Sequence, residues 1–225
     1  MSLFFVLGSW FLVLGSFVYS NLTQINGLNI AIIKYNAGNI MSVDYALQRL
    51  GIHAIVTGDI DRIRSADKVI FPGVGEASTT MQYLKAHKLD ALIRDLKQPV
   101  LGICLGLQLM CRHSEEGNTA CMGIFNEEIR KFTLPDRSAG FKIPHMGWNT
   151  ISNLKGSLFM PGLEGRYVYF VHSYYATTGE HTVAECNHIV SFSAALRHDN
   201  FYATQFHPEK SGRTGALILE NFLKL

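Results

Sequence analysis

Cys104 stands between two glycines in residues 102–106, directly after the apolar run 99–103. An apolar strand that ends in a nucleophile flanked by small residues is typical of a sharp strand-to-helix turn, an elbow that exposes the nucleophile at the carboxyl edge of a sheet. The glycines fit this interpretation because a tight turn crowds the backbone around the nucleophile. The free N–H groups of a helix beginning at Leu105 would stabilise the thiolate, the reactive form of cysteine. The segment therefore predicts a catalytic thiol.

A histidine and a carboxylate occur together in the tripeptide His207-Pro208-Glu209. Residues 200–206 alternate in character like a strand, so both side chains are expected where that strand leaves the sheet. A histidine beside a proline is more often an ordinary loop residue, but a strand end suits catalysis better. Cys104, His207 and Glu209 would then supply the nucleophile, the general base and the acceptor that fixes the imidazole tautomer.

These residues resemble the class I, triad-type glutamine amidotransferases, which hydrolyse glutamine and deliver the ammonia to a synthase. The resemblance rests on the elbow Gly-Ile-Cys-Leu-Gly-Leu-Gln at 102–108 and on His-Pro-Glu at 207–209. Two further segments agree in order and spacing. Residues 71–75 resemble the oxyanion loop of the family, and residues 170–175 resemble the segment whose backbone receives the amino-acid end of glutamine. The resemblance implies L-glutamine as the substrate.

The resemblance also implies roles around the thiol. The backbone N–H groups of Val74 and Leu105 would form an oxyanion hole for the charge that develops on the glutamine carbonyl oxygen. Because glycine reaches positive φ at little cost, Gly73 would let the neighbouring peptide flip between a resting and an active state. Gln108 lies one helical turn from Cys104; an ordinary helix-surface role is an equally weighted alternative. Substrate contacts are expected from Gly73, Gln108, Ser173 and Tyr174.

Gly73 and Gly75 follow an apolar strand and thus also suggest a dinucleotide-binding fingerprint. Ser78 occupies the place of the third glycine, and no helix is expected to begin immediately. The match is therefore weak, and no cofactor is predicted.

Two more segments resemble one branch of the family, in which the glutaminase subunit forms a heterodimer with a (β/α)8 cyclase subunit of histidine biosynthesis. They are Tyr-Asn-Ala-Gly-Asn at 35–39 and Pro-His-Met-Gly-Trp-Asn at 144–149, the latter expected as a loop. Lys34 departs from the branch, where many members carry an acidic residue. Met146 and Trp148 would suit either a core or a partner surface. The residues expected at the cyclase interface are Asn36, Asn39, Met146 and Trp148.

Other functions share much of this pattern. A stand-alone cysteine hydrolase or peptidase would have the same elbow and triad without a synthase partner. A paralogous subunit that feeds another synthase would look alike, because the ammonia acceptor is bound by the partner. A membrane-anchored interaction protein would be favoured if residues 1–27 were functional, although the intact catalytic residues argue against it.

Residues 1–27 form an apolar extension before the expected amidotransferase domain at 28–225. The apolar stretch 3–19 falls short of the roughly 20 residues that a bilayer span needs. It also lacks the basic region of a secretory signal. A reactive thiol and a partner that uses cytosolic intermediates belong in a reducing compartment. We therefore expect a cytoplasmic protein whose start site is placed too early, with a signal or an anchor as the alternative.

Composition narrows the ligand classes. With 20 basic and 18 acidic residues the chain has no bulk charge that would favour nucleic acid. Its four cysteines show no Cys-x-x-Cys spacing, so neither a zinc site nor a disulfide framework is predicted. Cys111 and Cys121 are expected to be small buried apolar residues.

Alternating strands and helices must position these groups. Strands are predicted at 29–33, 52–56, 68–71 and 100–103, and helices at 40–50, 79–96 and 105–110. Beyond residue 121 short strands are predicted at 123–132, 167–170, 181–186, 189–196 and 201–206, followed by a helix at 214–223. This order predicts an α/β fold with a mostly parallel central sheet flanked by helices and a mixed or antiparallel extension. Cys104 would lie at the carboxyl end of a strand, where open α/β sheets bind ligands.

Overall fold

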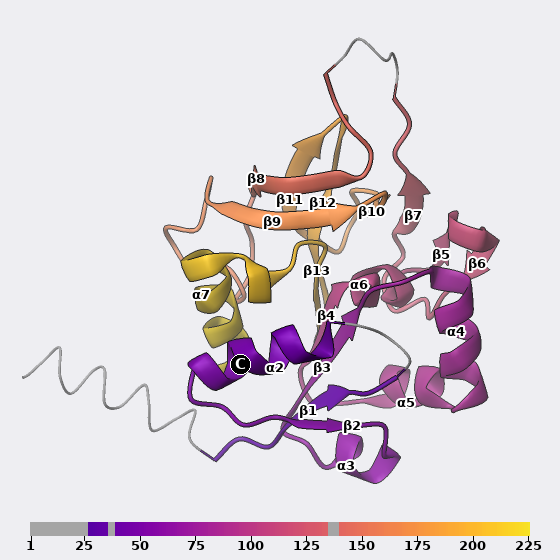
Figure 1. The fold of residues 1–225 in the computed structure, drawn as a ribbon, viewed down its shortest axis with the longest axis vertical. Helices are drawn as coiled ribbons and strands as arrows, with labels where there is room; N and C mark the ends of the chain where they lie inside the picture. Colours follow the sequence, from indigo (N-terminus) through magenta and orange to yellow (C-terminus); the bar gives the residue numbers. More distant parts are fainter. Residues whose placement is uncertain (1–26, 36–38, 135–139) are drawn as a thin grey trace, which may run out of the picture.

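The computed structural model describes residues 27–35, 39–134 and 140–225, and its α/β fold confirms the predicted class (Figure 1). One half of the main sheet is parallel, in the order β2-β1-β3-β4-β13. These strands are β1 (Ile30–Ile33), β2 (Ile55–Thr57), β3 (Lys68–Gly73), β4 (Val100–Cys104) and β13 (Phe201–Thr204). β4 lies between β3 and β13, so the elbow and the residues that follow β13 meet at one edge of the sheet.

The predicted mixed extension continues this sheet from β13 in the order β12-β10-β7-β5-β6, and β11 pairs with β12. Its pairs are antiparallel except for β5 with β7. A separate antiparallel pair, β8 with β9, lies over the carboxyl edge of β4. The strands are β5 (His113–Ser114), β6 (Thr119–Ala120), β7 (Glu128–Lys131), β8 (His145–Thr150), β9 (Tyr167–His172), β10 (Tyr174–Ala176), β11 (Thr182–His188) and β12 (Val190–His198).

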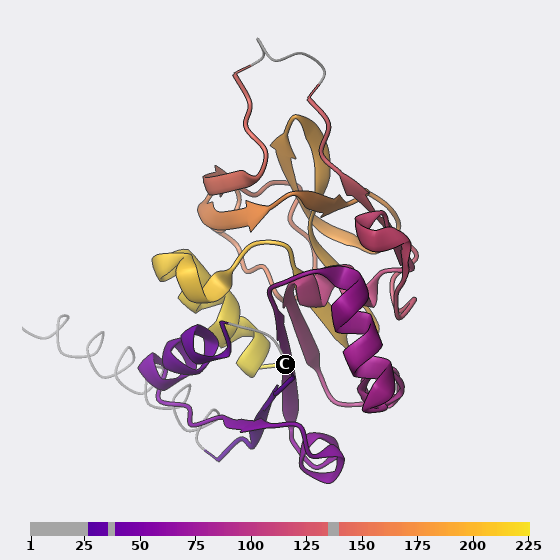
Figure 2. The same cartoon turned by 45° about the vertical axis from the view of Figure 1, so that its right-hand side comes forward.

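Helices cover both faces of the parallel half, because its strands are apolar on both sides. On β1, Ile30 and Ile32 pack into one core, and Ala31 and Ile33 into the other. The first core also contains α2 (Ile40–Arg49) and α7 (Gly212–Leu223), which lie side by side in Figures 1 and 2. The second contains α3 (Ile60–Arg64), α4 (Ala77–Ala86), α5 (Leu89–Asp95) and α6 (Leu105–Met110).

The prediction of a single helix at 79–96 is wrong, because this segment forms two separate helices, α4 and α5. Lys88 adopts a left-handed conformation with φ 57° between them. At the end of α4 the His87 ring hydrogen-bonds through Nδ1 to the carbonyl oxygen of Tyr83 at 2.8 Å, which also accepts from the backbone N–H of His87 at 3.1 Å. Neither glycine nor proline marks this break, so sequence patterns did not predict it.

The loop predicted at 144–149 is also wrong, because residues 145–150 form strand β8. Its alternation buries His145 and leaves Met146 and Trp148 exposed on one side. The apolar extension and Asn36 lie outside the described residues, except that Gly27 is described. Among the described helices, none has the length and apolar character needed to cross a bilayer.

Candidate active site

Cys104 occupies the elbow between β4 and α6, with φ 55° and ψ −105°. A residue with a β-carbon rarely adopts this conformation, and such strain occurs mainly where the surrounding fold imposes it, often at functional sites. Gly106 permits the turn by close approach, because a β-carbon there would lie 2.1 Å from the carbonyl oxygen of Phe71. The predicted sharp turn and its crowding are confirmed.

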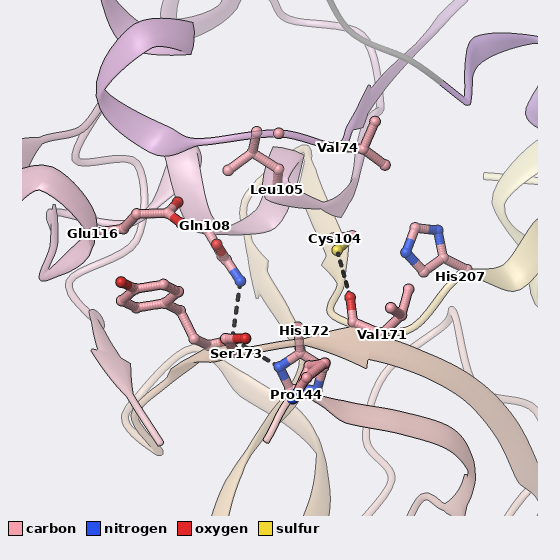
Figure 3. A pocket seen from close by; sticks show the side chains of 12 residues that line it. Val74, Cys104, Leu105, Gln108, Glu116, Pro144, Val171, His172, Ser173 and His207 are labelled. Carbon is pink, nitrogen blue, oxygen red and sulfur yellow. Dashed lines mark hydrogen bonds between the residues drawn. The ribbon is translucent and has the colours of Figure 1, made fainter. Parts of the chain in front are cut away.

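His207 and Glu209 follow the end of β13 and face the elbow from the neighbouring strand. The imidazole Nδ1 of His207 lies 2.7 Å from Oε1 of Glu209, and both side chains are almost completely buried. Among the described residues, Nε2 of His207 has no hydrogen-bond partner. Nδ1 is thereby committed to the carboxylate, while Nε2 stays available toward the pocket and the thiol (Figure 3).

The electrostatic surroundings favour a charged imidazole. Burial lowers the pKa of His207, but the negative charge of Cys104 and the hydrogen bond with Glu209 outweigh this effect and raise the pKa to about 10. The two charges support each other, since an imidazolium beside the sulfur stabilises a thiolate. The raised pKa therefore favours a protonated imidazole at His207 beside the sulfur.

A pocket of about 380 Å³ opens in front of the sulfur. Cys104, His207, Leu105 and Val74 line one part of it, and Gln108 another (Figure 3). The β9–β10 connection closes the opposite side with residues 171–174, which include the predicted Ser173 and Tyr174. The structure thus brings Cys104, His207 and most of the predicted substrate contacts to one cavity, while Glu209 contacts His207 from outside its lining. Further lining residues are Gly75, Glu116, Pro144, Val171 and His172.

Gln108 is buried, with 4% of its surface exposed, so the alternative of an ordinary helix-surface residue is wrong. Its Nε2 donates to the carbonyl oxygen of Tyr174 at 3.0 Å and to Oε1 of Gln205 at 3.1 Å. The amide nitrogen is therefore occupied by the protein. The carbonyl end of the Gln108 amide is the one that remains for a ligand.

Glu116, in the short helix η1 (Glu116–Asn118), belongs to the pocket but was missed in the sequence. Its Oε2 accepts from the backbone N–H of Ala77 at 2.8 Å. Burial raises the pKa of Glu116 against the effect of this hydrogen bond, with a smaller contribution from Glu76. Burial and the nearby carboxylates, Glu116 first, also raise the pKa of Tyr174. This end of the pocket therefore suits a cationic group. The sequence offered only an acidic pair after α6 and nothing that placed it near Cys104.

Val74 lies on the pocket wall beside the elbow, whereas Gly73 is absent from the described lining and pairs in register with Cys104. In this structure Gly73 is not among the described residues with positive φ, whereas Gly75 has φ 121°. A β-carbon on Gly73 would lie 2.7 Å from Leu105 and 2.8 Å from the hydroxyl of Tyr35. Close packing thus accounts for glycine at this position in the observed conformation, and the expected peptide flip stays a prediction.

Tyr35 anchors the strand that leads to Val74. Its buried hydroxyl donates to the carbonyl oxygen of Pro72 at 2.6 Å. Burial and the negative charge of Cys104 raise the pKa of Tyr35, so the phenol stays a donor. The segment expected at the cyclase interface thus begins with a residue that contacts the β3 end.

Asn39 ends that segment and was expected at the partner surface. It is half-buried, and its Nδ2 donates to Oε1 of Glu209 at 2.6 Å. Met146 and Trp148, on β8, are 65% and 55% exposed, so the core alternative for them is wrong. Trp148 contacts the ring of Tyr169 edge-on, with centroids 6.0 Å apart.

Comparison with known proteins agrees with this geometry. A family model described as "Glutamine amidotransferase class-I" matches residues 31–225. The chain is 60% identical over 198 residues to the "Imidazole glycerol phosphate synthase subunit HisH" of Bacteroides fragilis, covering 88% of this chain and 100% of that protein. The protein of the same name from Pasteurella multocida is 47% identical over 197 residues, covering 87% of this chain and 98% of its own length.

Solved structures show the same fold at low sequence identity. One titled "glutamine amidotransferase" has a TM-score of 0.66 at 17% identity, covering 86% of this chain and 97% of that chain. A "putative gmp synthase subunit a protein" from Thermoplasma acidophilum has a TM-score of 0.63 at 20% identity, covering 88% and 94%. With the family match and these relatives together, the chain belongs to the class-I glutamine amidotransferases and, among them, to the imidazole glycerol phosphate synthase HisH subunits.

Proposed function

We propose that this chain hydrolyses L-glutamine to glutamate and ammonia at Cys104 and passes the ammonia to a cyclase subunit of imidazole glycerol phosphate synthase. The cyclase would use it to form imidazole glycerol phosphate and an aminoimidazole carboxamide ribonucleotide in histidine biosynthesis. The observation that carries the proposal is the strained elbow of Cys104, which lines one pocket together with His207, whose imidazole is held by the buried Glu209.

Chemistry would begin from the thiolate of Cys104 and the imidazolium of His207. The sulfur attacks the carboxamide carbon of glutamine, and the C–N bond breaks as Nε2 of His207 gives its proton to the departing ammonia. The neutral imidazole then takes a proton from water, whose hydroxide attacks the thioester. Glutamate leaves, and the thiolate and imidazolium are restored. Glu209 keeps Nε2 directed to these steps by binding Nδ1.

Charge stabilisation would come from the backbone. The N–H groups of Val74 and Leu105 belong to residues on the pocket wall next to the sulfur, where the carbonyl oxygen of the substrate becomes an oxyanion. Loss of one such donor lowers turnover by roughly a hundred- to a thousandfold in other enzymes. Val74 is therefore the position at which a change of loop conformation would switch activity.

Recognition of a free amino acid needs groups for both charged ends. Glu116 is the pocket carboxylate suited to the α-ammonium group of glutamine. The backbone around Ser173 and Tyr174 is suited to the α-carboxylate, and the free carbonyl of Gln108 to an N–H of the substrate. This division favours glutamine over a peptide, whose chain would continue beyond both ends.

The cyclase would bind the face that presents Met146 and Trp148. Exposed Met and Trp side chains are enriched at interfaces and depleted on ordinary surfaces. Met41 and Tyr45 add further exposed apolar side chains on α2, which lies on the same side of the sheet as α7 and β8 in Figures 1 and 2. Asn39 extends from this side to the triad.

A cytoplasmic location follows from the proposed chemistry. A thiolate nucleophile is inactivated by oxidation, and all cysteines in the described residues are free. We propose the amidotransferase domain as residues 28–225, with the preceding residues dispensable for activity. Enzyme with a start at Asn26 would then be as active as the full chain.

The test is ammonia release from glutamine by the full chain, with and without the cyclase subunit and its nucleotide-derived substrate. We expect a low rate alone and a strong rise in kcat, with little change in KM, when both are added. Cys104→Ser should abolish release in a folded protein. Full activity without any cyclase would instead identify a stand-alone hydrolase, and activation only by a different synthase would identify a paralogous subunit.

A further inference from the structure

Gln205 is a completely buried polar side chain two positions before His207. It follows β13, and its backbone N–H donates to the carbonyl oxygen of Ala194 at 2.8 Å, which holds this position against β12. Burial of a primary amide is costly unless its donors and acceptor are paired. The partners of the Gln205 amide therefore indicate what it does.

Both ends of this amide bind residues of the candidate active site. Nε2 donates to Sγ of Cys104 at 3.6 Å, and Oε1 accepts from Nε2 of Gln108 at 3.1 Å. The orientation is determined by the neighbours, because the reverse would set two amide nitrogens against each other. With its oxygen directed to Gln108, Gln205 must direct its N–H to the sulfur.

Besides the nearby imidazole of His207, the sulfur of Cys104 has two hydrogen bonds of opposite kind among the described residues. As a thiol it donates to the carbonyl oxygen of Val171 at 3.9 Å, and it accepts from Gln205. A thiolate has no proton for Val171, whereas the N–H of Gln205 becomes a charge-assisted donor. The two contacts therefore favour different protonation states, and only the Gln205 contact favours the nucleophilic one.

We propose that Gln205 is a further residue of the reaction machinery, which holds the thiolate of Cys104 through Nε2 and fixes the Gln108 amide through Oε1. This inference rests on the proposed glutaminase function and deepens it. With its nitrogen bound by Gln205 and by the Tyr174 carbonyl, Gln108 presents its carbonyl end to the pocket. The buried amide of Gln205 thus contacts both the nucleophile Cys104 and the substrate contact Gln108, and it fixes the position of each.

The proposal predicts two separable defects. Gln205→Met keeps the length of the side chain but removes both hydrogen-bonding groups. It should lower kcat roughly 10- to 100-fold, the range expected for loss of a hydrogen bond to a charged group. KM for glutamine should rise several-fold because Gln108 loses a fixed orientation. Alkylation of Cys104 by iodoacetamide should slow in parallel with kcat, since it requires the same thiolate.

The experiment compares four full-length proteins, each bound to the cyclase subunit for kinetics and alone for alkylation. They are the native chain, Gln205→Met, Gln205→Glu and the control Gln98→Met. Gln98 is a partly buried amide whose Nε2 binds the carbonyl of Ile63, so its loss should leave alkylation and kcat unchanged. Gln205→Glu preserves shape and an acceptor for Gln108 but sets a carboxylate against the sulfur. It should slow alkylation at least as much as Gln205→Met, with a smaller rise in KM.

Alkylation and kcat within twofold of the native values in both Gln205 variants would overturn the proposal and leave Gln205 a packing residue. If Gln205→Met does not fold, the isosteric Gln205→Glu decides alone by the same criterion. Failure of the proposed function is a different result, namely no ammonia from glutamine by the native complex. Alkylation would still measure the contact between Gln205 and Cys104 in that case.

Discussion

Asn39 and His207 share one carboxylate oxygen, Oε1 of Glu209, at 2.6 Å and 2.7 Å respectively. Asn39 has φ 70° at the start of α2, and its side chain does not cap that helix. A residue at this position normally binds the first backbone N–H groups of its helix. Asn39 instead uses its amide on the triad, which connects the start of α2 to the catalytic histidine.

Asn39→Asp should therefore impair turnover more than Asn39→Gly. Both residues tolerate positive φ, so backbone strain is matched. Aspartate sets a second negative charge against Glu209, whereas glycine only removes a hydrogen bond. We expect kcat to fall roughly 10-fold or more for Asn39→Asp and severalfold for Asn39→Gly. Steady-state glutaminase assays of the complex provide the measurement, and equal kcat values in both variants would contradict a role at Glu209.

Loss of His207 and loss of Glu209 should lower kcat by different factors. His207→Ala removes the group that moves protons and should lower kcat by at least roughly a thousandfold. Glu209→Ala removes only its orientation and charge support and should cost less. The double variant should be close to His207→Ala alone, because residues that act as a unit are not additive. These roles would be contradicted if the two single variants lost kcat equally and the loss in the double variant were the product of the two.

Tyr35→Phe tests the anchor of the β3 end. The change leaves the buried carbonyl of Pro72 without its donor, which should lower the free energy of unfolding by about 1–3 kcal/mol. Because Pro72 precedes the peptide that leads to Val74, kcat should fall more than KM changes. Tyr83→Phe is the matched control, since Tyr83 is a half-buried ring on α4, outside the proposed cyclase face. Urea unfolding and glutaminase kinetics would measure both effects, and a Tyr35→Phe protein as active as the control would exclude the anchor from catalysis.

Much of this site was predictable because its chemistry is local. The elbow around Cys104 and the tripeptide at 207–209 are contiguous in sequence, and a parallel sheet order brings two such strand ends together. Glu116 and Gln205 were missed because their roles depend on contacts between distant elements. In the sequence Gln205 resembles any other polar residue of a strand. Its contact with the sulfur arises because β13 pairs with β4.

The surface residues were less predictable for a related reason. The segment at 144–149 contains a glycine and an asparagine, which favour a loop, yet pairing with β9 makes it a strand. Tertiary pairing outweighed local propensity there. Asn39 was expected to face a partner, and its contact with Glu209 links residues whose separation of 170 positions hides the relationship.

Stability should fall in mild acid through buried neutral histidines. Burial, with a smaller contribution from His188, lowers the pKa of His145 to about 4, and burial lowers that of His172 to about 3. Both have the ordinary value of 6.5 when unfolded, so between pH 4 and 6.5 the unfolded chain binds more protons. The free energy of unfolding should therefore decrease as the pH falls from 6 to 5, by up to about 1.4 kcal/mol per pH unit for each of these two histidines.

His145→Phe should reduce the slope of the free energy of unfolding against pH, because only one of the two buried histidines then takes up a proton on unfolding. The variant keeps an aromatic ring against Phe170. His53→Gln is the matched control at an exposed histidine and should leave the slope unchanged. Chemical unfolding at intervals between pH 5 and 6 gives the slopes. An unchanged slope in His145→Phe would show that His145 is already protonated in the folded protein.

Trp148→Ala tests the proposed cyclase surface. The side chain is more than half exposed and contributes little to the core, so the free energy of unfolding should change by less than about 1 kcal/mol. At an interface a buried tryptophan is a frequent hot spot, and its loss should weaken association with the cyclase roughly 30-fold or more. Ile55→Ala is the control, because Ile55 is exposed on β2, at the far end of the fold from β8 (Figure 1). Calorimetric titration of each variant with the cyclase measures the affinity. Native affinity in Trp148→Ala would show that the cyclase does not bind at β8.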